Sequence, residues 1–519
     1  MPEKITPNSK VGRGILAAVI IASGMAFLDG SVVNVALPTI ERLLHTNIAG
    51  LQWIVDAYLL ALAALLLGAG ALSDRYGRRL IFTFGIGLFT LASLACALAP
   101  TATSLILARA IQGIGAAAMV PGSIAIIRHT FAENIQGQVL GLWSGLAGGV
   151  AALGPFVGGW LVEHAGWPSI FLINVPLGIV ALILALNYVP ESKSSQADRI
   201  DWPGLTLITV ALVALAYGLT EGPLLGWQTP LVIASLIGSF GAVIVFGLVE
   251  NRSPAPIVNF TIFRTPTVLG ANLATLLIYF ALNAAIFFLV LAFQQVLGYS
   301  PTVAGLALLP PILLITFGSG FGGKLADRIG ARTPLIIGPA IVAIGMISFV
   351  LLKAGGNYWL TVFPGLVLFG LGMAIVIAPI TMSALAVERD SAGVASGVNN
   401  AIARIASLLA IAILGGVAYA IFKNNLVSLL NHSGLSTTFQ HDLLSQADRL
   451  GGIDIYKNWP VTDQKIAVSL IERGLTGAFH ITFVVAAVCA AGGSLVATIF
   501  IQKTNPSPAD VATSASGES

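Results

Sequence analysis

The chain contains fourteen predominantly apolar runs, each long enough to cross a lipid bilayer as one helix. A spanning helix needs about 20 apolar residues, whereas a membrane barrel strand needs about 10 with strict alternation. The runs are longer than such strands and continuously apolar, so we expect helices, whose backbone groups are satisfied within each segment. The runs lie near residues 14–36, 53–72, 80–99, 104–126, 138–161, 168–189, 204–220, 229–249, 267–292, 302–323, 333–353, 358–380, 394–421 and 476–501.

The composition excludes a soluble protein of this size. Of the 519 residues, 56% are hydrophobic and only 9% are charged, whereas soluble domains are about 25% charged. The net charge of +3 is too small to indicate a nucleic-acid partner. The two cysteines, Cys96 and Cys489, both fall inside apolar runs, so we expect neither a disulfide framework nor a metal site.

The basic residues predict the orientation of the chain in the membrane. With the N-terminus inside, 16 of the 25 lysines and arginines fall in cytoplasmic segments and two fall in the short outer loops. Positive charge is enriched in short cytoplasmic loops. We therefore expect a multi-pass protein of the cell (inner) membrane with both termini in the cytoplasm.

A loop motif occurs twice, which indicates an internal repeat. The segments 70–79 and 323–332 share Gly, Asp, Arg, Gly and Arg at one offset of 253 residues. Each copy follows the second helix of a six-helix set, and parallel halves of this kind are typical of transporters. We predict an all-α membrane protein with two parallel six-helix halves and an inserted helix pair. The predicted parts are an N-terminal bundle (1–190), inserted helices 7 and 8 (191–265), a C-terminal bundle (266–501) with a long outer loop (422–475), and a disordered cytoplasmic tail (502–519).

The motifs resemble those of the major facilitator superfamily, and in particular its fourteen-helix drug:proton antiporter branch (EmrB/QacA type). The resemblance extends over all fourteen runs in order. It rests on the loop Gly-x-Leu-x-Asp-Arg-x-Gly-Arg-Arg and on the segments 28–38, 53–58, 109–113, 154–159 and 171–176.

Four charged residues lie within the apolar runs: Asp29, Asp56, Arg109 and Arg404. Each costs about 2.5–3.5 kcal/mol at a helix centre, so we expect them to face a water-filled cavity or one another. One interpretation is a packing ion pair of Arg109 with one of the two aspartates. The other is proton coupling through Asp29, Asp56 and Arg109, and the resemblance implies that role for Asp29 and Arg109.

Two further motifs predict conformational and packing roles. The repeated loop predicts a conformational latch, although a solvated turn remains the alternative. The segment 154–159 combines closely spaced glycines with a proline, which allows close helix approach and bending, and the resemblance marks it as an antiporter motif. The latch residues are Gly70, Asp74, Arg75, Gly77, Arg78, Asp327 and Arg328, and the packing motif comprises Gly154, Pro155, Gly158 and Gly159.

The candidates for lining a substrate cavity are Asn34, Tyr58, Gln112, Asn399, Asn400 and Arg404. Asn399, Asn400 and Arg404 occupy a region in which polycation exporters of this branch carry carboxylates. We therefore expect a neutral, monocationic or anionic substrate, although the two amides can also serve as hydrogen bonds between helices.

The predicted function is export of small amphipathic compounds in exchange for protons, by alternating access, in the manner of multidrug efflux. No Walker lysine motif occurs, so we expect no cofactor and a proton gradient as the driving force. The expected partners are a small-molecule substrate, protons and the lipid bilayer, and we expect a monomer. The alternatives are a proton-coupled exporter or importer of one metabolite and, from another class, a membrane receptor or enzyme.

The outer loop, residues 422–475, is polar. Its stretch from Asp463 to Leu475 can form a short amphipathic helix on the outer surface. We expect this loop to serve either as an extracellular cap or as a partner contact.

Overall fold

The computed structural model describes residues 6–193, 201–253, 256–258, 260–387, 392–455 and 459–502. Every regular element within these ranges is a helix, and fourteen segments are long and apolar enough to cross a membrane. The predicted all-α class with fourteen spans is confirmed. The predicted domain boundaries stay predictions, and residues 503–519 of the predicted tail lie outside the described residues.

The chain forms two compact units, which are described separately. The first unit comprises residues 1–257, 290–307 and 411–475, and the second comprises 258–289, 308–410 and 476–519. The helices of the first unit are α1 (Lys10–Leu43), α2 (Ile48–Tyr76), α3 (Arg78–Ala97), α4 (Ala102–Thr130), α5 (Glu133–Ala165), α6 (Ser169–Leu172), α7 (Asn174–Tyr188), α8 (Trp202–Leu225), α9 (Pro230–Glu250), α11 (Pro301–Ala307), α17 (Thr437–Ser445) and the 3₁₀ helix η4 (Ala447–Gly452).

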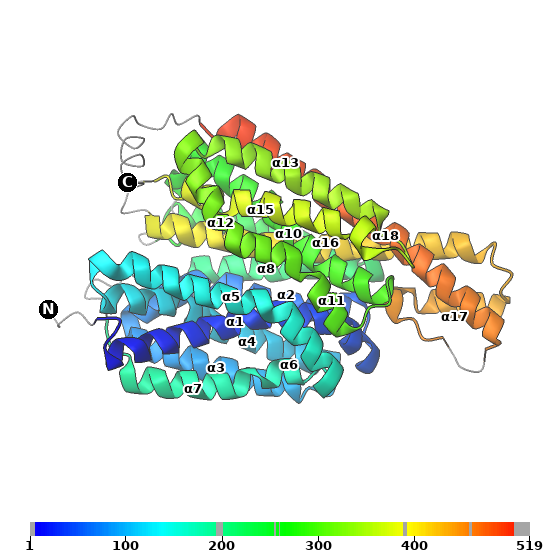
Figure 1. Cartoon of the computed structure of the whole chain (residues 1–519), viewed down its shortest axis with the longest axis horizontal. Helices are drawn as coiled ribbons and strands as arrows, with labels where there is room; N and C mark the ends of the chain where they lie inside the picture. The colour runs from blue at the N-terminus through cyan, green and yellow to red at the C-terminus, as the bar shows by residue number, and fades with distance from the viewer. Residues whose placement is uncertain are drawn as a thin grey trace. The chain divides into compact units, whose positions relative to one another are not determined.

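The second unit is built around α15. The helices α12 and α13 both pack against α15, and Figure 1 shows the three running lengthwise beside one another. Three helices contribute residues to both units: α10 (Pro266–Gln295), α16 (Ala392–Leu430) and α18 (Val461–Phe500). The other helices of the second unit are η1 (Phe260–Arg264), α12 (Leu309–Ile329), α13 (Arg332–Ser348), η2 (Phe349–Leu351), α14 (Tyr358–Thr361) and α15 (Phe363–Ala384).

The helix ends are set by local residues. The side chains of Ser9, Asn47 and Asp201 accept hydrogen bonds from the first backbone N–H groups of α1, α2 and α8, which otherwise have no partner within the helix. Gly77, between α2 and α3, has φ +126°, and Gly330, after α12, has φ +80°. Both occupy the same position of the repeated loop, and glycine tolerates this left-handed region without the strain of a Cβ.

Glycines of α5 bring this helix into close contact with α1 and α11. A Cβ at Gly158 would lie 2.9 Å from Cβ and 3.0 Å from Cα of Val32 on α1. A Cβ at Gly159 would lie 2.2 Å from the backbone oxygen of Pro301 on α11. Small residues allow such approach in membrane bundles, so the predicted packing motif lies at two helix interfaces of the first unit.

We expect Gly158→Ala to destabilise the first unit, because its new methyl group meets the backbone of α1. Overpacking of this kind costs about 1–3 kcal/mol. Gly149→Ala is the matched control, since it lies on the same helix and its Cβ would meet no atom within 4 Å. Thermal unfolding in detergent measures both variants, and equal melting temperatures for the two would contradict the assigned interface.

Two helices extend further than the sequence indicates. Predicted span 394–421 is part of α16, which ends at Leu430, and predicted span 476–501 is part of α18, which begins at Val461. The segment from Asp463 to Leu475 is therefore helical, but it continues directly into the last span and does not form a separate surface helix. The expected helix is present, and it runs on into the last span because no proline occurs between Asp463 and Phe500.

Within the first unit, η4 of the segment 422–475 packs against α1 and α2. A Cβ at Gly452 would lie 2.7 Å from the carboxyl carbon of Glu41, and one at Gly451 would lie 2.6 Å from the side-chain carbonyl carbon of Gln295. Asn47 donates a hydrogen bond of 3.1 Å to Asp448. These contacts fix η4 against the ends of α1 and α2.

Candidate functional site

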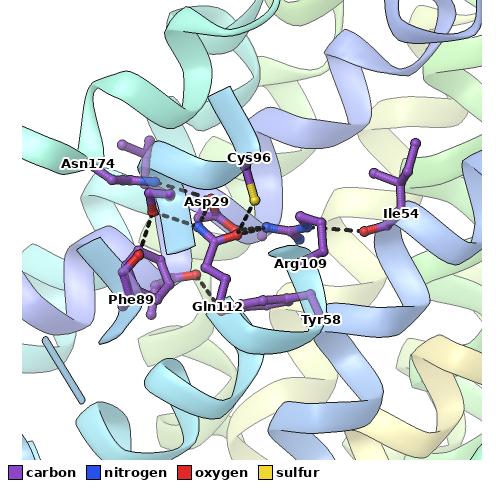
Figure 2. A network of polar contacts seen from close by, with 12 residues as sticks. Asp29, Ile54, Tyr58, Phe89, Cys96, Arg109, Gln112 and Asn174 are labelled. Carbon is purple, nitrogen blue, oxygen red and sulfur yellow. Dashed lines mark hydrogen bonds and ion pairs between the residues drawn. The ribbon is translucent and has the colours of Figure 1, made fainter. Parts of the chain in front are cut away.

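A buried ion pair lies at the centre of the first unit. The Arg109 guanidinium on α4 donates to Oδ2 of Asp29 on α1. Asp29 is 0% exposed and Arg109 is 1% exposed. Figure 2 shows the two side chains pointing toward each other between their helices. The expectation that charges within the spans face one another is confirmed for this pair.

Two amides complete the coordination of the Asp29 carboxylate. Gln112 donates to Oδ1 of Asp29 at 2.8 Å, and Asn174, the first residue of α7, donates to the same oxygen at 3.2 Å. Gln112 also donates to the Ser93 hydroxyl at 2.9 Å and accepts from Arg109 at 2.6 Å. All of these side chains are buried, and they come from α1, α3, α4 and α7.

The guanidinium of Arg109 has further contacts with a backbone oxygen and with two aromatic rings. Its Nε donates to the backbone oxygen of Ile54 on α2 at 3.0 Å. Its central carbon lies 4.3 Å from the centre of the Tyr58 ring and 5.8 Å from that of Phe171, within the range of cation–π attraction. The Tyr58 hydroxyl donates to the backbone oxygen of Ala26 at 3.1 Å.

This arrangement links protonation to helix contacts. Both oxygens of Asp29 accept hydrogen bonds, Oδ2 from Arg109 and Oδ1 from the two amides. A proton added to either oxygen competes with one of these donors, and it removes the charge that balances Arg109. Losing one partner of a buried pair costs about 3–5 kcal/mol. A single proton at Asp29 therefore changes the free energy of contacts between α1, α4 and α7.

Asp56 lies outside this network. Its side chain is 1% exposed, and neither carboxylate oxygen has a hydrogen-bond partner among the described residues. The sequence predicted a shared role for Asp29 and Asp56 in proton coupling, and the structure places only Asp29 against Arg109. The two acids thus occupy different environments, one fully coordinated and the other buried without a polar partner.

We expect Asp56→Asn to leave the melting temperature unchanged or to raise it. An isolated ionised carboxylate is costly to bury, and the amide has the same shape without the charge. The matched comparison is Asp29→Asn, which removes a coordinated carboxylate and should lower the melting temperature. Thermal unfolding of both variants in the same detergent tests this contrast. An equal decrease of the melting temperature in the two variants would show that Asp56 has a polar partner of its own.

The first copy of the repeated loop forms an ion pair. Asp74, at the end of α2, accepts from Nε and Nη2 of Arg78 at 2.9 and 2.7 Å. Arg75 lies over the ring of Tyr76 at 5.8 Å, and a Cβ at Gly70 would meet no atom within 4 Å. The pair is partly exposed, and such pairs contribute about 0–1 kcal/mol. The contact is therefore weak enough to break and reform during a conformational change.

The second copy of the loop differs from the first. Asp327 and Arg328, in the last turn of α12, are both exposed. Ala331 occupies the position that corresponds to Arg78, so the second copy has no arginine at that place to pair with its aspartate. The latch interpretation stays a prediction for both copies.

The predicted cavity residues separate into two groups. In the first unit Asn34 is buried and donates to Gly30 of its own helix at 3.3 Å, while Tyr58 and Gln112 belong to the ion-pair network. In the second unit Asn399, Asn400 and Arg404 line one cavity between α10, α15 and α16.

Ser93, Phe171 and Asn174 belong to the network but were not among the site residues predicted from the sequence. Asn174 and Phe171 belong to a segment that was used only for the family resemblance. The sequence does contain a signal for Asn174 as a site residue, because it is a polar residue within an apolar run, two positions before Pro176. The short helix α6 precedes it, so Asn174 begins α7 and its side chain reaches Asp29.

A bundle of fourteen apolar helices long enough to cross a membrane, with an ion pair buried among them, is typical of membrane transport proteins. The model of the Major Facilitator Superfamily matches residues 19–411. The chain belongs to this superfamily, and it is therefore a multi-pass membrane transporter of small molecules and not an enzyme.

Several relatives are named as efflux or resistance proteins. The chain is 38% identical over 407 residues to "Multidrug resistance protein Stp" of Mycobacterium tuberculosis. The matched region covers 77% of this chain and 75% of that protein. It is 39% identical over 400 residues to "Methylenomycin A resistance protein" of Streptomyces coelicolor. That match covers 76% of this chain and 83% of the relative.

Among solved structures, a bacterial homologue of the human lysosomal transporter Spinster, in an inward-facing and unoccupied conformation, is similar to this chain. The TM-score is 0.66 with 18% sequence identity, and the match covers 96% of this chain and all of that one. This similarity shows the fold.

Proposed function

We propose that this protein exports small amphipathic, drug-like compounds from a bacterial cell in exchange for protons. It works in the cell membrane as a monomer, with both termini in the cytoplasm and without a cofactor. The relatives named for multidrug and methylenomycin resistance support export as the direction. The observation that carries the proton coupling is the buried pair of Asp29 and Arg109 with its two amides.

In the proposed cycle the Asp29 carboxylate alternately binds a proton and pairs with the Arg109 guanidinium. When the site opens to the acidic outside, a proton neutralises Asp29 and releases Arg109. When the site opens to the cytosol, the proton leaves and the ion pair reforms. One charge that crosses 100 mV is worth about 2.3 kcal/mol, which supports a substrate gradient of roughly 50-fold per proton.

Asp56 is a second proton carrier in this proposal. It lies on α2, whose Ile54 carbonyl accepts from Arg109, so a change in the ion pair acts on the helix that carries Asp56. The pair of Asp74 and Arg78 lies at the end of the same helix, where it acts as a latch that breaks as the loop moves.

Everted membrane vesicles with an acidic lumen test the proposal. Adding a substrate outside is expected to raise the luminal pH, because the exporter takes substrate in and releases protons outward. An importer in the same vesicles would move substrate from the lumen to the outside. Substrate accumulation that continues after the proton gradient is collapsed would contradict proton coupling.

A further inference from the structure

The second unit contains a polar cavity with an arginine in its wall. It has a volume of about 290 Å³ and lies between α10, α15 and α16, which is close to the lower end of the range for ligand pockets, about 300–1,000 Å³. Its polar lining includes the side chains of Tyr279, Asn283, Asn399, Asn400 and Arg404. None of the lining residues that the structure describes is an aspartate or a glutamate.

Among the lining residues within the described ranges, Arg404 alone carries a full charge. It lies within the spanning part of α16, Ala395–Leu430. No ion pair or hydrogen bond to its guanidinium occurs within the described parts of the chain. A charge at membrane depth is normally paired or turned toward a water-filled cavity. Arg404 contrasts with Arg109, which has a carboxylate, an amide and a carbonyl as partners.

The cavity keeps free hydrogen-bond donors beside the charge of Arg404. Asn400 uses one N–H on the Ser396 carbonyl at 2.9 Å and Asn283 uses one on the Tyr279 carbonyl at 2.7 Å, so each amide keeps a second N–H. The arginine keeps all five of its N–H groups. The hydroxyls of Thr381 and Ser407 already donate to carbonyls of their own helices.

Asn399 has a different role from its neighbour. Its amide nitrogen donates to Thr275 at 2.8 Å and to Asn272 at 3.2 Å, both on α10. Both of its N–H groups are therefore engaged in hydrogen bonds between α16 and α10. Asn399 therefore positions the wall of the cavity, while Arg404 and Asn400 remain open to a ligand.

We propose that this cavity binds the acidic group of the substrate, so that the transported class includes amphipathic organic acids held through a carboxylate on Arg404. Planar guanidinium groups bind carboxylates through two parallel hydrogen bonds, and Asn283 and Asn400 supply further donors beside it. This inference rests on the proposed export function and names the class of compound that it carries.

The experiment measures binding to the purified full-length protein in detergent, without a membrane gradient. Isothermal titration calorimetry compares naphthaleneacetic acid with its methyl ester, which has the same rings and no charge, and with the cation tetraphenylphosphonium. We expect the wild type to bind the acid more tightly than the ester. Arg404→Gln should weaken binding of the acid by at least about tenfold and leave the ester within about twofold. The affinity of Arg404→Lys for the acid should lie between those of the wild type and Arg404→Gln.

The matched control is Arg264→Gln, which removes the same charge from an exposed position of the second unit outside the cavity. We expect it to change none of the three affinities. Equal binding of acid and ester by the wild type, or equal losses for both in Arg404→Gln, would overturn the proposal. Because no gradient is present, failure of proton coupling leaves this readout intact, and the two proposals fail separately.

Discussion

Replacing Asp29 with asparagine is expected to abolish proton-driven transport, while the protein still inserts into the membrane. Asparagine cannot take up and release the proton, and its amide leaves Arg109 without the negative charge that lies against it. Uptake into everted vesicles under an imposed pH gradient measures the effect. We expect the transport rate to fall to that of vesicles without the protein.

The control for this variant is Asp463→Asn, which makes the same change at a partly exposed position near the start of α18. It should transport at the wild-type rate. Gel filtration of both proteins in detergent establishes that each is folded and monodisperse. Normal proton-coupled uptake by Asp29→Asn would refute the assigned role of Asp29.

Removing both members of the ion pair is expected to restore stability without restoring transport. Asp29→Asn and Arg109→Gln each leave one buried charge uncompensated, and such losses are about 3–5 kcal/mol. The double variant has neither charge, so its loss should be smaller than the sum of the two by about 0.5–3 kcal/mol or more. Thermal unfolding of the four proteins gives this coupling free energy.

The transport readout separates coupling from folding. A double variant that is nearly as stable as the wild type but inactive shows that the pair is needed for coupling and not only for packing. Additive losses of stability would mean that the two side chains do not interact. Proton-driven transport by the stable double variant would show that the pair is a packing element.

The sequence predicts the number of spans because long apolar runs have few alternatives in lipid. The ends of the helices are less well determined. α16 and α18 extend well beyond the apolar runs, because their added turns mix polar with apolar residues and so interrupt the continuous apolar run. The repeat in the sequence corresponds to a repeat in the backbone, because Gly77 and Gly330 occupy the same position of the loop and both have positive φ values.

The candidate site could be predicted only in part. The free-energy cost of charges in lipid singles out Asp29 and Arg109, yet the choice between Asp29 and Asp56 as partner of Arg109 needs the packing of α1 against α4. Hydropathy carries no information on that contact, and the two residues are 80 positions apart. Ser93 and Gln112 are neutral residues, and their importance arises only because Gln112 donates both to Asp29 and to Ser93.

The most direct test of the proposed coupling is the proton release that accompanies substrate binding. The purified protein in weakly buffered detergent solution, with a pH indicator dye, reports protons released when a saturating substrate is added. The wild type should release protons, and Asp29→Asn should release fewer, with any remainder attributable to Asp56. Release from Asp29→Asn equal to that of the wild type would contradict the claim that Asp29 carries the exchanged proton.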